Sequence, residues 1–438
     1  MTVFQNQWHC LDVPAIGDWS PTAKVSVIVP TRDSPNRLSS LLQSLAHQTY
    51  PSDLLEIVVV DDGSEPALKL PERIGAVPVA TVRRDTDGTF GAGRARNIGA
   101  RAATGEVLLF LDTDILAGPR AVESLARWCL TDPAAMVTAI LGFFDDEALP
   151  RDELNAAITE DSLAELLRPI ASHDQSWRDN TFTRTHDLTT DAPDLFRIVI
   201  GAVMALHRDL FDRLGGLREL GVRGIEDTEF GFRAHTAGSL LVLDREAQLW
   251  HQGRRHFDTG KAAETKERRE PLMQDLIAAP GFRRSSKRCP SVPSLIVDLT
   301  EVRDQAEIAS WVVTDTNDVR FLVDEFQHAD ERFTAADAYS PRDRSAVPYQ
   351  ARPLAPIRVT SDTVDLLRAR LQSDMLGVLH VVDERGEELL EVTSTRAVGR
   401  AVLAGVNTND RDALVAAAGA CFGEWWLPGS DVGVERSS

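Results

Sequence analysis

Blocks of apolar residues alternate with amphipathic stretches along the first part of the chain. Residues 24–30, KVSVIVP, are mostly β-branched and end at a proline, which predicts a buried strand. LEIVVVDDGS and VLLFLDTDIL predict two further strands. Helices are predicted between them, one from the spacing of Leu38, Leu41, Leu42 and Leu45 and one that begins near GAGRARNIGARAATGE. This alternation predicts an α/β domain with a Rossmann-like, mostly parallel sheet covered on both faces.

Polar residues stand where each predicted strand ends. Residues 30–32 follow the first strand, residues 61–63 the second and residues 112–114 the third. Ligands bind outside the carboxyl ends of parallel strands, so we expect these groups to line one site. A simple dehydrogenase would carry GxGxxG after its first strand. TRDSPN stands there instead, and GAGRARNIG opens the helix before the third strand, which excludes that class of enzyme.

The length of 438 residues and the changes in composition predict two domains. A basic stretch, GFRRSSKRCP, lies among prolines near residues 280–293 and predicts a boundary. We therefore expect an N-terminal extension (1–22), a first domain (23–270), a connector (271–290) and a second, smaller α/β domain (291–438). The second domain is predicted from apolar runs such as SLIVDLT and GVLHVVD and from helix-like segments such as TVDLLRARL.

Charge and cysteine usage exclude several classes of protein. The net charge of −20 argues against a nucleic-acid binder, because phosphate contacts need concentrated Lys and Arg. The four cysteines are far apart and form no CxxC pair, which argues against a zinc site or a disulfide framework. We find no secretory signal pattern and no apolar run of the roughly 20 residues that a spanning helix needs, so we expect a cytoplasmic protein without a transmembrane segment.

Asp112 and Asp114 are the clearest candidates for chemistry, because they follow a strand apolar enough for the middle of a sheet. An unpaired buried carboxylate is costly, so the two acids either lie at an edge or hold a cation. At positions i and i+2 of an extended chain they would project from the same side, which favours a site for a hard metal ion. An ordinary turn at the end of the strand is the alternative.

Four motifs, in order along the chain, resemble those of family 2 glycosyltransferases with the GT-A fold: VSVIVPTRD, VVVDDGS, ARNIGARAATGEVLLFLDTD and GIEDTEFGFR. The resemblance covers roughly residues 23–270 and does not extend to the tail. It implies an enzyme that transfers a sugar from a UDP-sugar to a hydroxyl of a glycan acceptor, by a single displacement with inversion. It also implies Mn²⁺ or Mg²⁺, which would neutralise the departing diphosphate.

The resemblance also implies roles for single residues. Asp114 and His251 would bind the metal, and Asp112 would contact the ribose or the metal's water shell. Asp62 would accept a hydrogen bond from the uracil ring. Arg94 or Arg96 would reach the diphosphate, and Asn97 either contacts the donor or only holds its loop. The donor-binding residues implied in this way are Pro30, Thr31, Arg32, Asp62, Arg94, Asn97, Asp112, Thr113 and Glu226, and the metal-binding residues are Asp112, Asp114 and His251.

The segment RGIEDTEFGFR is similar to the WGGED-type element of chondroitin-synthesising enzymes and β-galactosyltransferases. In those families the Asp of the Glu-Asp pair is the general base, which implies that role for Asp227. Two positions depart from the pattern: Arg223 replaces a Trp that helps to form the acceptor platform, and Ile225 replaces the second Gly. The alternative is that Glu226 and Asp227 only pair with Arg223 or Arg233.

Other interpretations stay open. His251 is alternatively structural. If it binds the metal, the basic residues Arg254, Arg255 and His256 are predicted on a loop that closes over the diphosphate. A nucleotidyltransferase would need a basic clamp after the first strand, where only Arg32 and Arg37 stand. The remaining alternatives are a non-catalytic nucleotide-sugar-binding relative and a glycosyltransferase that acts on a peptide or natural-product scaffold, with the tail as a docking domain.

Overall fold

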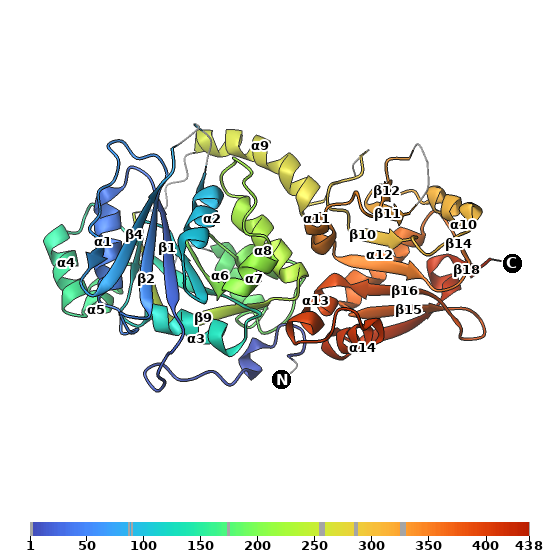
Figure 1. The fold of residues 1–438 in the computed structure, drawn as a ribbon, viewed down its shortest axis with the longest axis horizontal. Coiled ribbons are helices and arrows are strands. Elements are labelled where there is room, and N and C mark those ends of the chain that lie inside the picture. The colour runs from blue at the N-terminus through green and yellow to red at the C-terminus, as the bar shows by residue number, and fades with distance from the viewer. Residues whose placement is uncertain are drawn as a thin grey trace.

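The computed structural model describes residues 3–85, 88, 91–172, 176–253, 259–283, 288–324 and 330–437. Two large sheets, one in each half of the molecule, are flanked by helices (Figure 1). The prediction of an α/β fold is therefore confirmed. Within the described residues no helix is both long and apolar enough to cross a membrane.

The first sheet has the strand order β3-β4-β2-β1-β5-β8-β7-β9-β6. Strands β4, β2, β1 and β5 are parallel to one another, as the alternating pattern predicts. β8 is antiparallel to both β5 and β7, whereas β7 and β9 are parallel. The strands are β1 (Val25–Thr31), β2 (Leu55–Asp61), β3 (Arg73–Ile74), β4 (Val77–Arg83), β5 (Val107–Leu111), β6 (Ile115–Ala117), β7 (Ala135–Phe144), β8 (Val203–His207) and β9 (Leu240–Gln252).

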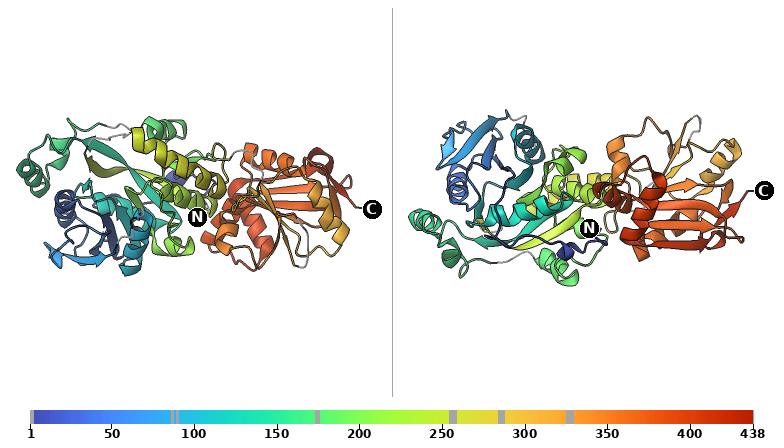
Figure 2. Two further views of the ribbon diagram at one scale, coloured as in Figure 1. Left: turned by 90° about the horizontal axis from the view of Figure 1, so that it is seen from above. Right: turned by 60° about the horizontal axis from the view of Figure 1, so that its bottom comes forward.

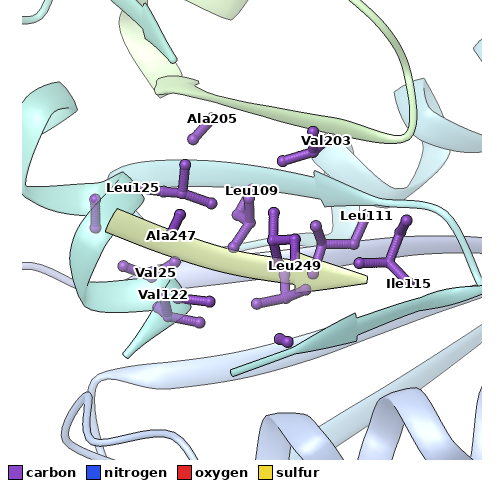
Figure 3. Packing of buried hydrophobic residues seen from close by; sticks show 14 of the residues in the cluster. Val25, Leu109, Leu111, Ile115, Val122, Leu125, Val203, Ala205, Ala247 and Leu249 are labelled. Atoms are coloured by element: carbon purple, nitrogen blue, oxygen red, sulfur yellow. The ribbon is translucent and has the colours of Figure 1, made fainter. Parts of the chain in front are cut away.

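Alternate residues of the central strands pack into separate cores on the two faces of this sheet. Val27 and Leu109 belong to the core under helices α1 and α3, part of which Figure 3 shows. Ile28 and Phe110 belong to the core on the opposite face, under α7 and α8. The helices of this half are α1 (Pro35–Ala46), α2 (Ala92–Ala102), α3 (Ala121–Thr131), α4 (Arg151–Thr159), α5 (Leu163–Leu167), α6 (Ser176–Arg184), α7 (Arg208–Arg213), α8 (Glu226–Thr236) and α9 (Thr259–Leu276), with the 3₁₀ turns η1 (Trp8–Cys10) and η2 (Leu195–Ile198).

The second sheet has the order β12-β11-β10-β13-β16-β15-β17, and a separate pair joins β14 and β18. Its strands are β10 (Leu295–Asp298), β11 (Val319–Val323), β12 (Phe333–Ala335), β13 (Tyr349–Pro353), β15 (Val378–Val382), β16 (Glu388–Ser394) and β17 (Glu424–Pro428); the separate pair is β14 (Ile357–Val359) and β18 (Val434–Arg436). The helices are α10 (Gln305–Ser310), α11 (Pro341–Ala346), α12 (Thr363–Asp374), α13 (Thr395–Leu403) and α14 (Arg411–Phe422), with η3 (Trp311–Val313) and η4 (Gly429–Val432).

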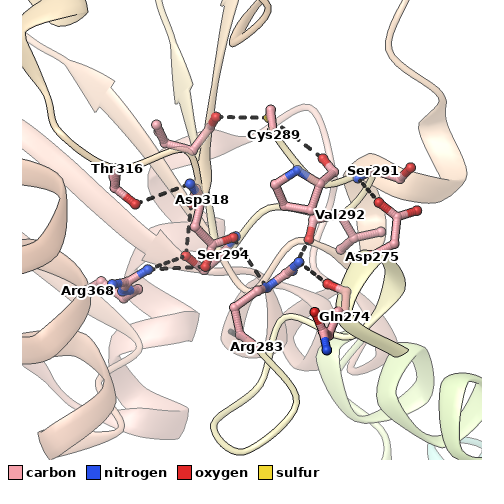
Figure 4. Close-up of polar contacts among 12 residues, drawn as sticks. Gln274, Asp275, Arg283, Cys289, Ser291, Val292, Ser294, Thr316, Asp318 and Arg368 are labelled. Atoms are coloured by element: carbon pink, nitrogen blue, oxygen red, sulfur yellow. Dashed lines mark hydrogen bonds and ion pairs between the residues drawn. The ribbon is translucent and has the colours of Figure 1, made fainter. Parts of the chain in front are cut away.

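The two halves share one hydrophobic core instead of meeting through a loose linker. Helix α9 runs through residue 270, where the sequence predicts a boundary, and reaches the second domain (Figure 1). The core around Phe110 also contains Val292, Leu322 and Val347 of the second domain. Beyond α9, Arg283 donates to the carbonyl oxygens of Gln274 and Val292 and faces Asp318, as Figure 4 shows. The connector is thus fixed to both sides.

The N-terminal segment lies at this junction (Figure 2). The Asn6 amide donates to Leu241 O of strand β9 at 2.9 Å and accepts from Leu241 N at 3.0 Å. Arg400 of α13 donates to the carbonyl oxygens of Val3 (3.2 Å) and Gln5 (2.9 Å). Because one short segment binds both domains, we expect it to help hold them together.

Buried charges also connect the domains. Asp191, which precedes η2, is fully buried and pairs with Arg396 of α13, and its Oδ1 lies 3.7 Å from Nε2 of His235 on α8. Burial alone would raise the pKa of Asp191, but Arg396 and His235 lower it below its usual range. Burial and the charge of Arg396 lower the pKa of His235 to about 4. His235 is therefore neutral in the folded protein at neutral pH.

This histidine predicts a loss of stability in mild acid. Between pH 6.5 and about 4 the unfolded chain binds a proton at His235 that the folded chain does not bind. The free energy of unfolding should fall by about 2 kcal/mol from this residue between pH 7.5 and 5. Urea denaturation at both pH values should show that fall in the wild type and in the control His47→Gln, whose histidine is exposed, but a smaller one in His235→Gln. An equal fall in His235→Gln would contradict this explanation.

Candidate active site

A cavity of about 560 Å³ opens where strands β1, β2 and β5 end. Its volume falls in the range of small-molecule sites. Nine of the residues implied as donor-binding, metal-binding or catalytic line it, together with Arg96, Gly201 and Arg223. The nine are Pro30, Thr31, Arg32, Asp62, Asp112, Thr113, Asp114, Glu226 and Asp227. The polar groups at the three strand ends thus gather at one place, although the first and the third are separated by about 80 residues of the chain.

Residues 112–114 form a turn between β5 and β6, so the extended geometry expected for the two acids is wrong. Thr113 Oγ1 donates to Thr31 Oγ1 at 3.0 Å, which ties the turn to the end of β1. The two carboxylates then face different partners. Asp112 Oδ1 accepts from Arg96 Nη2 at 2.6 Å, and Asp114 Oδ2 lies 3.3 Å from His251 Nε2.

The Asp114–His251 pair has the properties of an incomplete metal site. Asp114 Oδ1 and His251 Nδ1 are both buried without a hydrogen-bond partner. The His251 ring is held by stacking on Phe143, with centroids 4.8 Å apart. Burial raises the pKa of the Asp114 carboxyl, although His251 opposes this, and the negative charge of Asp112 adds to the rise. One carboxylate and one imidazole suit a divalent cation, which would remove the cost of the unpaired oxygen.

The protein side chains do not complete a metal shell by themselves. In the part of the chain that the structure describes, no group of three or more His, Cys, Asp or Glu side chains is gathered as a metal site. Asp112 is turned toward Arg96 instead. The residues present therefore fit a cation that takes its other ligands from a bound substrate, such as the oxygens of a diphosphate.

Arg96 is the buried cation of the cavity. Burial alone would lower its pKa, but the charges of Asp112, Glu226 and Asp227 raise the pKa above its ordinary value. Its guanidinium has room only because residue 201 is a glycine. A Cβ atom at Gly201 would lie 2.3 Å from Arg96 Nη2 and 2.5 Å from Cζ.

Gly201→Ala should therefore displace Arg96 and weaken its bond to Asp112. Arg96 lies in the same cavity as the catalytic candidates, so we expect turnover to fall about tenfold or more, while a global unfolding signal stays close to wild type. The control Ser39→Ala changes an exposed residue of α1 that does not line this cavity. Full activity in Gly201→Ala would show that the position of Arg96 is unimportant.

Glu226 and Asp227 begin helix α8 at the wall of the cavity. Asp227 Oδ2 accepts from Gly201 N at 3.1 Å, and Oδ1 accepts from Thr228 N at 2.8 Å. The helix N-terminus favours the charged carboxylate. Glu226 is buried, and burial and the charge of Asp227 raise its pKa. The two acids thus lie in different environments, with Asp227 half-exposed in the cavity and Glu226 beneath it.

The alternative that Arg233 neutralises these two acids is wrong, because Arg233 binds Glu229 through two nitrogens at 2.7 and 2.9 Å. Arg223 is exposed and lines the cavity. Asp62 directly follows strand β2. Among the described residues its carboxylate accepts from Arg84, and its backbone N donates to Thr31 O at 2.9 Å. Arg32 projects into solvent at the rim, 3.5 Å from Asp33.

Comparison with known proteins identifies the domain that carries this cavity. Residues 26–214 match the family model described as Glycosyl transferase family 2. These residues form a family 2 glycosyltransferase domain. The family implied by the four sequence motifs is thereby confirmed. The match covers strands β1 to β8, including the polar groups at the ends of β1, β2 and β5, and it stops before α8.

Two curated relatives each match about half of this chain. Validoxylamine A glucosyltransferase of Streptomyces hygroscopicus subsp. limoneus is 31% identical over 244 residues, which is 53% of this chain and 52% of that protein. Hyaluronan synthase of Pasteurella multocida is 29% identical over 242 residues, 52% of this chain and 24% of that protein. The chain thus spans about half of the first relative and a quarter of the second.

Among solved structures, residues 1–349 of S. aureus TarS in complex with UDP-GlcNAc are 16% identical to the chain. That match has a TM-score of 0.40 and covers 58% of this chain and 67% of the solved TarS chain, residues 1–349. At this sequence identity and TM-score, the position of UDP-GlcNAc in TarS says nothing about ligand binding in this chain.

In the glycosyltransferase domain, two implied donor contacts lie outside the cavity. Arg94 Nε donates to Glu219 Oε2 at 2.9 Å. The Asn97 amide donates to Leu217 O and accepts from Leu217 N, both at 2.9 Å, so it holds the loop 214–219 as the alternative proposed. Of the two arginines named in the sequence, Arg96 lines the cavity and Arg94 does not, because the two point about 200° apart on a helix. Contact of any of these residues with a donor stays a prediction. Arg254, Arg255 and His256 lie outside the described residues.

Sequence reasoning missed two glycines that the cavity requires. Gly201 makes room for Arg96, as described above. At Gly91, which precedes α2, a Cβ atom would lie 2.2 Å from Arg84 Nη2 and 2.9 Å from Asp62 Oδ2. Both glycines stand where a charged pair passes close to the backbone, and only the folded chain reveals that closeness.

Proposed function

We propose that the chain is a metal-dependent glycosyltransferase that transfers a sugar from a UDP-sugar to an acceptor hydroxyl with inversion. One observation carries the proposal: Asp62, Asp112, Asp114 and Asp227 line a single cavity, and His251 Nε2 lies 3.3 Å from Asp114 Oδ2, while the other polar atom of each side chain is buried without a hydrogen-bond partner. The family of the domain supports the reaction type. Asp112, Asp114, Glu226 and Asp227 all line the cavity, and His251 lies beside Asp114.

Asp227 is the group placed to act on the acceptor. As the acceptor hydroxyl attacks the anomeric carbon, Asp227 takes its proton, and the bond between the anomeric carbon and the diphosphate breaks. Gly201 N and Thr228 N hold the carboxylate in position through this step. A divalent cation held by Asp114 and His251 would supply positive charge for the departing diphosphate. Asp62 would bind the uracil, and Arg32, which lines the same cavity, would stack on the face of the base.

A panel of UDP-sugars tests this function. We expect UDP release from at least one of UDP-glucose, UDP-N-acetylglucosamine, UDP-galactose and UDP-glucuronate in the presence of Mn²⁺ or Mg²⁺, and little with EDTA. The acceptors offered should include oligosaccharides and non-glycan hydroxyl compounds, because one relative is named for validoxylamine A and another for hyaluronan. UDP binding without any UDP release would favour the non-catalytic alternative. Failure to bind UDP at all would refute the proposal.

A nucleotidyltransferase is less consistent with the cavity. Its clamp would require Arg37, but Arg37 donates to both carboxylate oxygens of Asp146 at 2.9 and 3.0 Å. Of Arg32 and Arg37, Arg32 lines the cavity and Arg37 does not.

Asp114→Ala and His251→Ala should each raise the Mn²⁺ concentration needed for half-maximal UDP release by about tenfold or more. Asp114→Ala removes Oδ1 and His251→Ala removes Nδ1, the buried atoms of this pair that have no hydrogen-bond partner in the structure. Initial rates across a Mn²⁺ titration measure the effect, and His47→Ala, an exposed histidine, is the control. Wild-type metal dependence in both variants would remove the metal site from the account.

A further inference from the structure

Three arginines and two carboxylates connect the second domain to the helix that begins with Glu226 and Asp227. We call this group the α8 network: Arg218, Glu229, Arg233, Arg342 and Asp343. Glu229 and Arg233 belong to α8, Arg218 to the loop before it, and Arg342 and Asp343 to α11 of the second domain. Helices α8 and α11 pack against each other at the junction (Figure 1).

Glu229 is the centre of the network on α8 and is fully buried. Its Oε1 accepts from Arg218 Nε and from Arg233 Nε, both at 2.7 Å. Burial alone would raise the pKa of Glu229, but Arg233 and Arg218 lower it below its ordinary value. Glu229 is thus a buried carboxylate two residues from Asp227, and its position depends on how the two guanidinium groups are held.

Asp343 supplies the second carboxylate from the other domain. Arg218 Nη2 donates to Asp343 Oδ1 while its Nε binds Glu229, so one guanidinium joins α11 to α8. Arg342 Nη2 donates to Gly216 O at 2.9 Å, and Arg233 Nη2 donates to the same oxygen at 2.8 Å. Two residues of α11 therefore contact the loop that precedes α8.

The loop 214–219 is also fixed from the side of α2. Gly215 and Gly216 both have positive φ angles, +70° and +68°, and a Cβ atom at Gly216 would lie 2.8 Å from Asn97 Oδ1. Asn97 binds both backbone groups of Leu217 and is the next residue after Arg96 of the cavity. The same loop therefore connects α11, α8 and the helix that carries Arg96.

The charge balance of the α8 network makes Asp343 important. Three guanidinium groups share two carboxylates, and burial together with Arg233 and Arg218 lowers the pKa of Arg342 to about 10. Loss of the Asp343 charge would leave three cations around Glu229 alone. The repulsion would be relieved by movement of Arg218 or Arg342, and Arg218 is bound to α8.

We infer that Asp343 of the second domain is a positioning residue, which acts through Arg218 and Glu229 to hold the N-terminal turn of α8, and with it Asp227, at the cavity. The second domain is then part of the catalytic unit and not a detachable docking module. The predicted effect of Asp343 on turnover rests on the proposed function. Its predicted effect on helix α8 does not.

Asp343→Asn in the full chain tests the inference against a matched control. Asp298→Asn removes the carboxylate that binds Arg344, the next residue of the same helix α11, at 3.0 Å, and that pair lies within the second domain. We expect Asp343→Asn to lower the kcat of UDP release at least fivefold, with the UDP-sugar that reacts fastest in the panel, and to leave the Kd for UDP within twofold. Asp343→Glu should recover part of the rate, and Asp298→Asn should stay within twofold of wild type.

Hydrogen exchange of the full chain supplies a readout that does not need activity. Amides of residues 226–230 should exchange at least fivefold faster in Asp343→Asn than in wild type or Asp298→Asn. If no UDP-sugar reacts with the wild type, the proposed function fails while this measurement still tests the inference. Unchanged exchange in this turn, or an equal effect of Asp298→Asn, would overturn the inference. A wild-type kcat in Asp343→Asn would overturn its catalytic part.

Discussion

Replacing Asp227 by asparagine is expected to lower sugar transfer by about 10²–10⁴-fold while UDP binding changes little. The amide oxygen of asparagine can still accept from Gly201 N or Thr228 N, so the local structure should persist. What is lost is the negative oxygen that takes the acceptor proton. Turnover measured as UDP release, together with the Kd for UDP from calorimetry, separates these two effects.

Asp209→Asn is the matched control for this experiment. Asp209 also lies in the first turn of a helix, α7, but its side chain is 81% exposed and it does not line the cavity. The Asp209→Asn variant should retain wild-type turnover. If Asp227→Asn lost UDP binding as severely as turnover, Asp227 would be a donor-binding residue and the assignment of the base would be wrong.

The largest expected effect on stability comes from Arg396→Met. Methionine keeps much of the packing against Phe422 but leaves Asp191 charged, buried and without its strongest partner. Removing one member of a buried ion pair costs about 3–5 kcal/mol. Urea denaturation at pH 7.5 should show a loss of this size in the free energy of unfolding, and the two domains should unfold together because they share a core.

Two further variants identify the cause of that loss. In Asp191→Asn/Arg396→Met no unpaired charge remains, so part of the stability should return. Arg245→Met removes an arginine that binds Asp187 through two nitrogens at 2.6 Å, but that pair is exposed, and we expect a loss below about 1 kcal/mol. Equal losses in Arg396→Met and Arg245→Met would show that burial of the interdomain pair is unimportant.

The sequence predicted the parts of the site that lie at strand ends. Parallel strands place their carboxyl ends at one edge, so Thr31, Asp62 and Asp112 were expected together, and they line one cavity. The strand predicted at residues 24–30 is β1, Val25–Thr31. These features follow from local periodicity and from a general rule of sheet topology, and neither requires the tertiary contacts to be known.

The parts that were missed depend on contacts between distant segments. The turn at residues 112–114 separates the two acids because Thr113 binds Thr31 and Arg96 binds Asp112. The choice between Arg94 and Arg96 had a usable signal: Gly93, Asn97 and Ala100 share a helix face that is buried, and Arg94 does not lie on it. Gly201, 105 residues after Arg96, gave no local signal at all.

The division into domains also shows the limits of local patterns. A basic, proline-flanked stretch predicted a connector beginning at residue 271, yet α9 continues through Leu276 and the core crosses the junction. Composition detects the basic loop but not the apolar residues Ile277 and Val292 that pack beside it. A contact such as that of Arg218 with Asp343, 125 residues apart, is visible only in the folded chain.

A crystal structure of the full chain with UDP and Mn²⁺ tests the central claim most directly. The account predicts that the nucleotide occupies the cavity, with the uracil at Asp62 and with Mn²⁺ between Asp114, His251 and the diphosphate oxygens. UDP bound elsewhere, or bound in this cavity with Mn²⁺ on neither Asp114 nor His251, would contradict it.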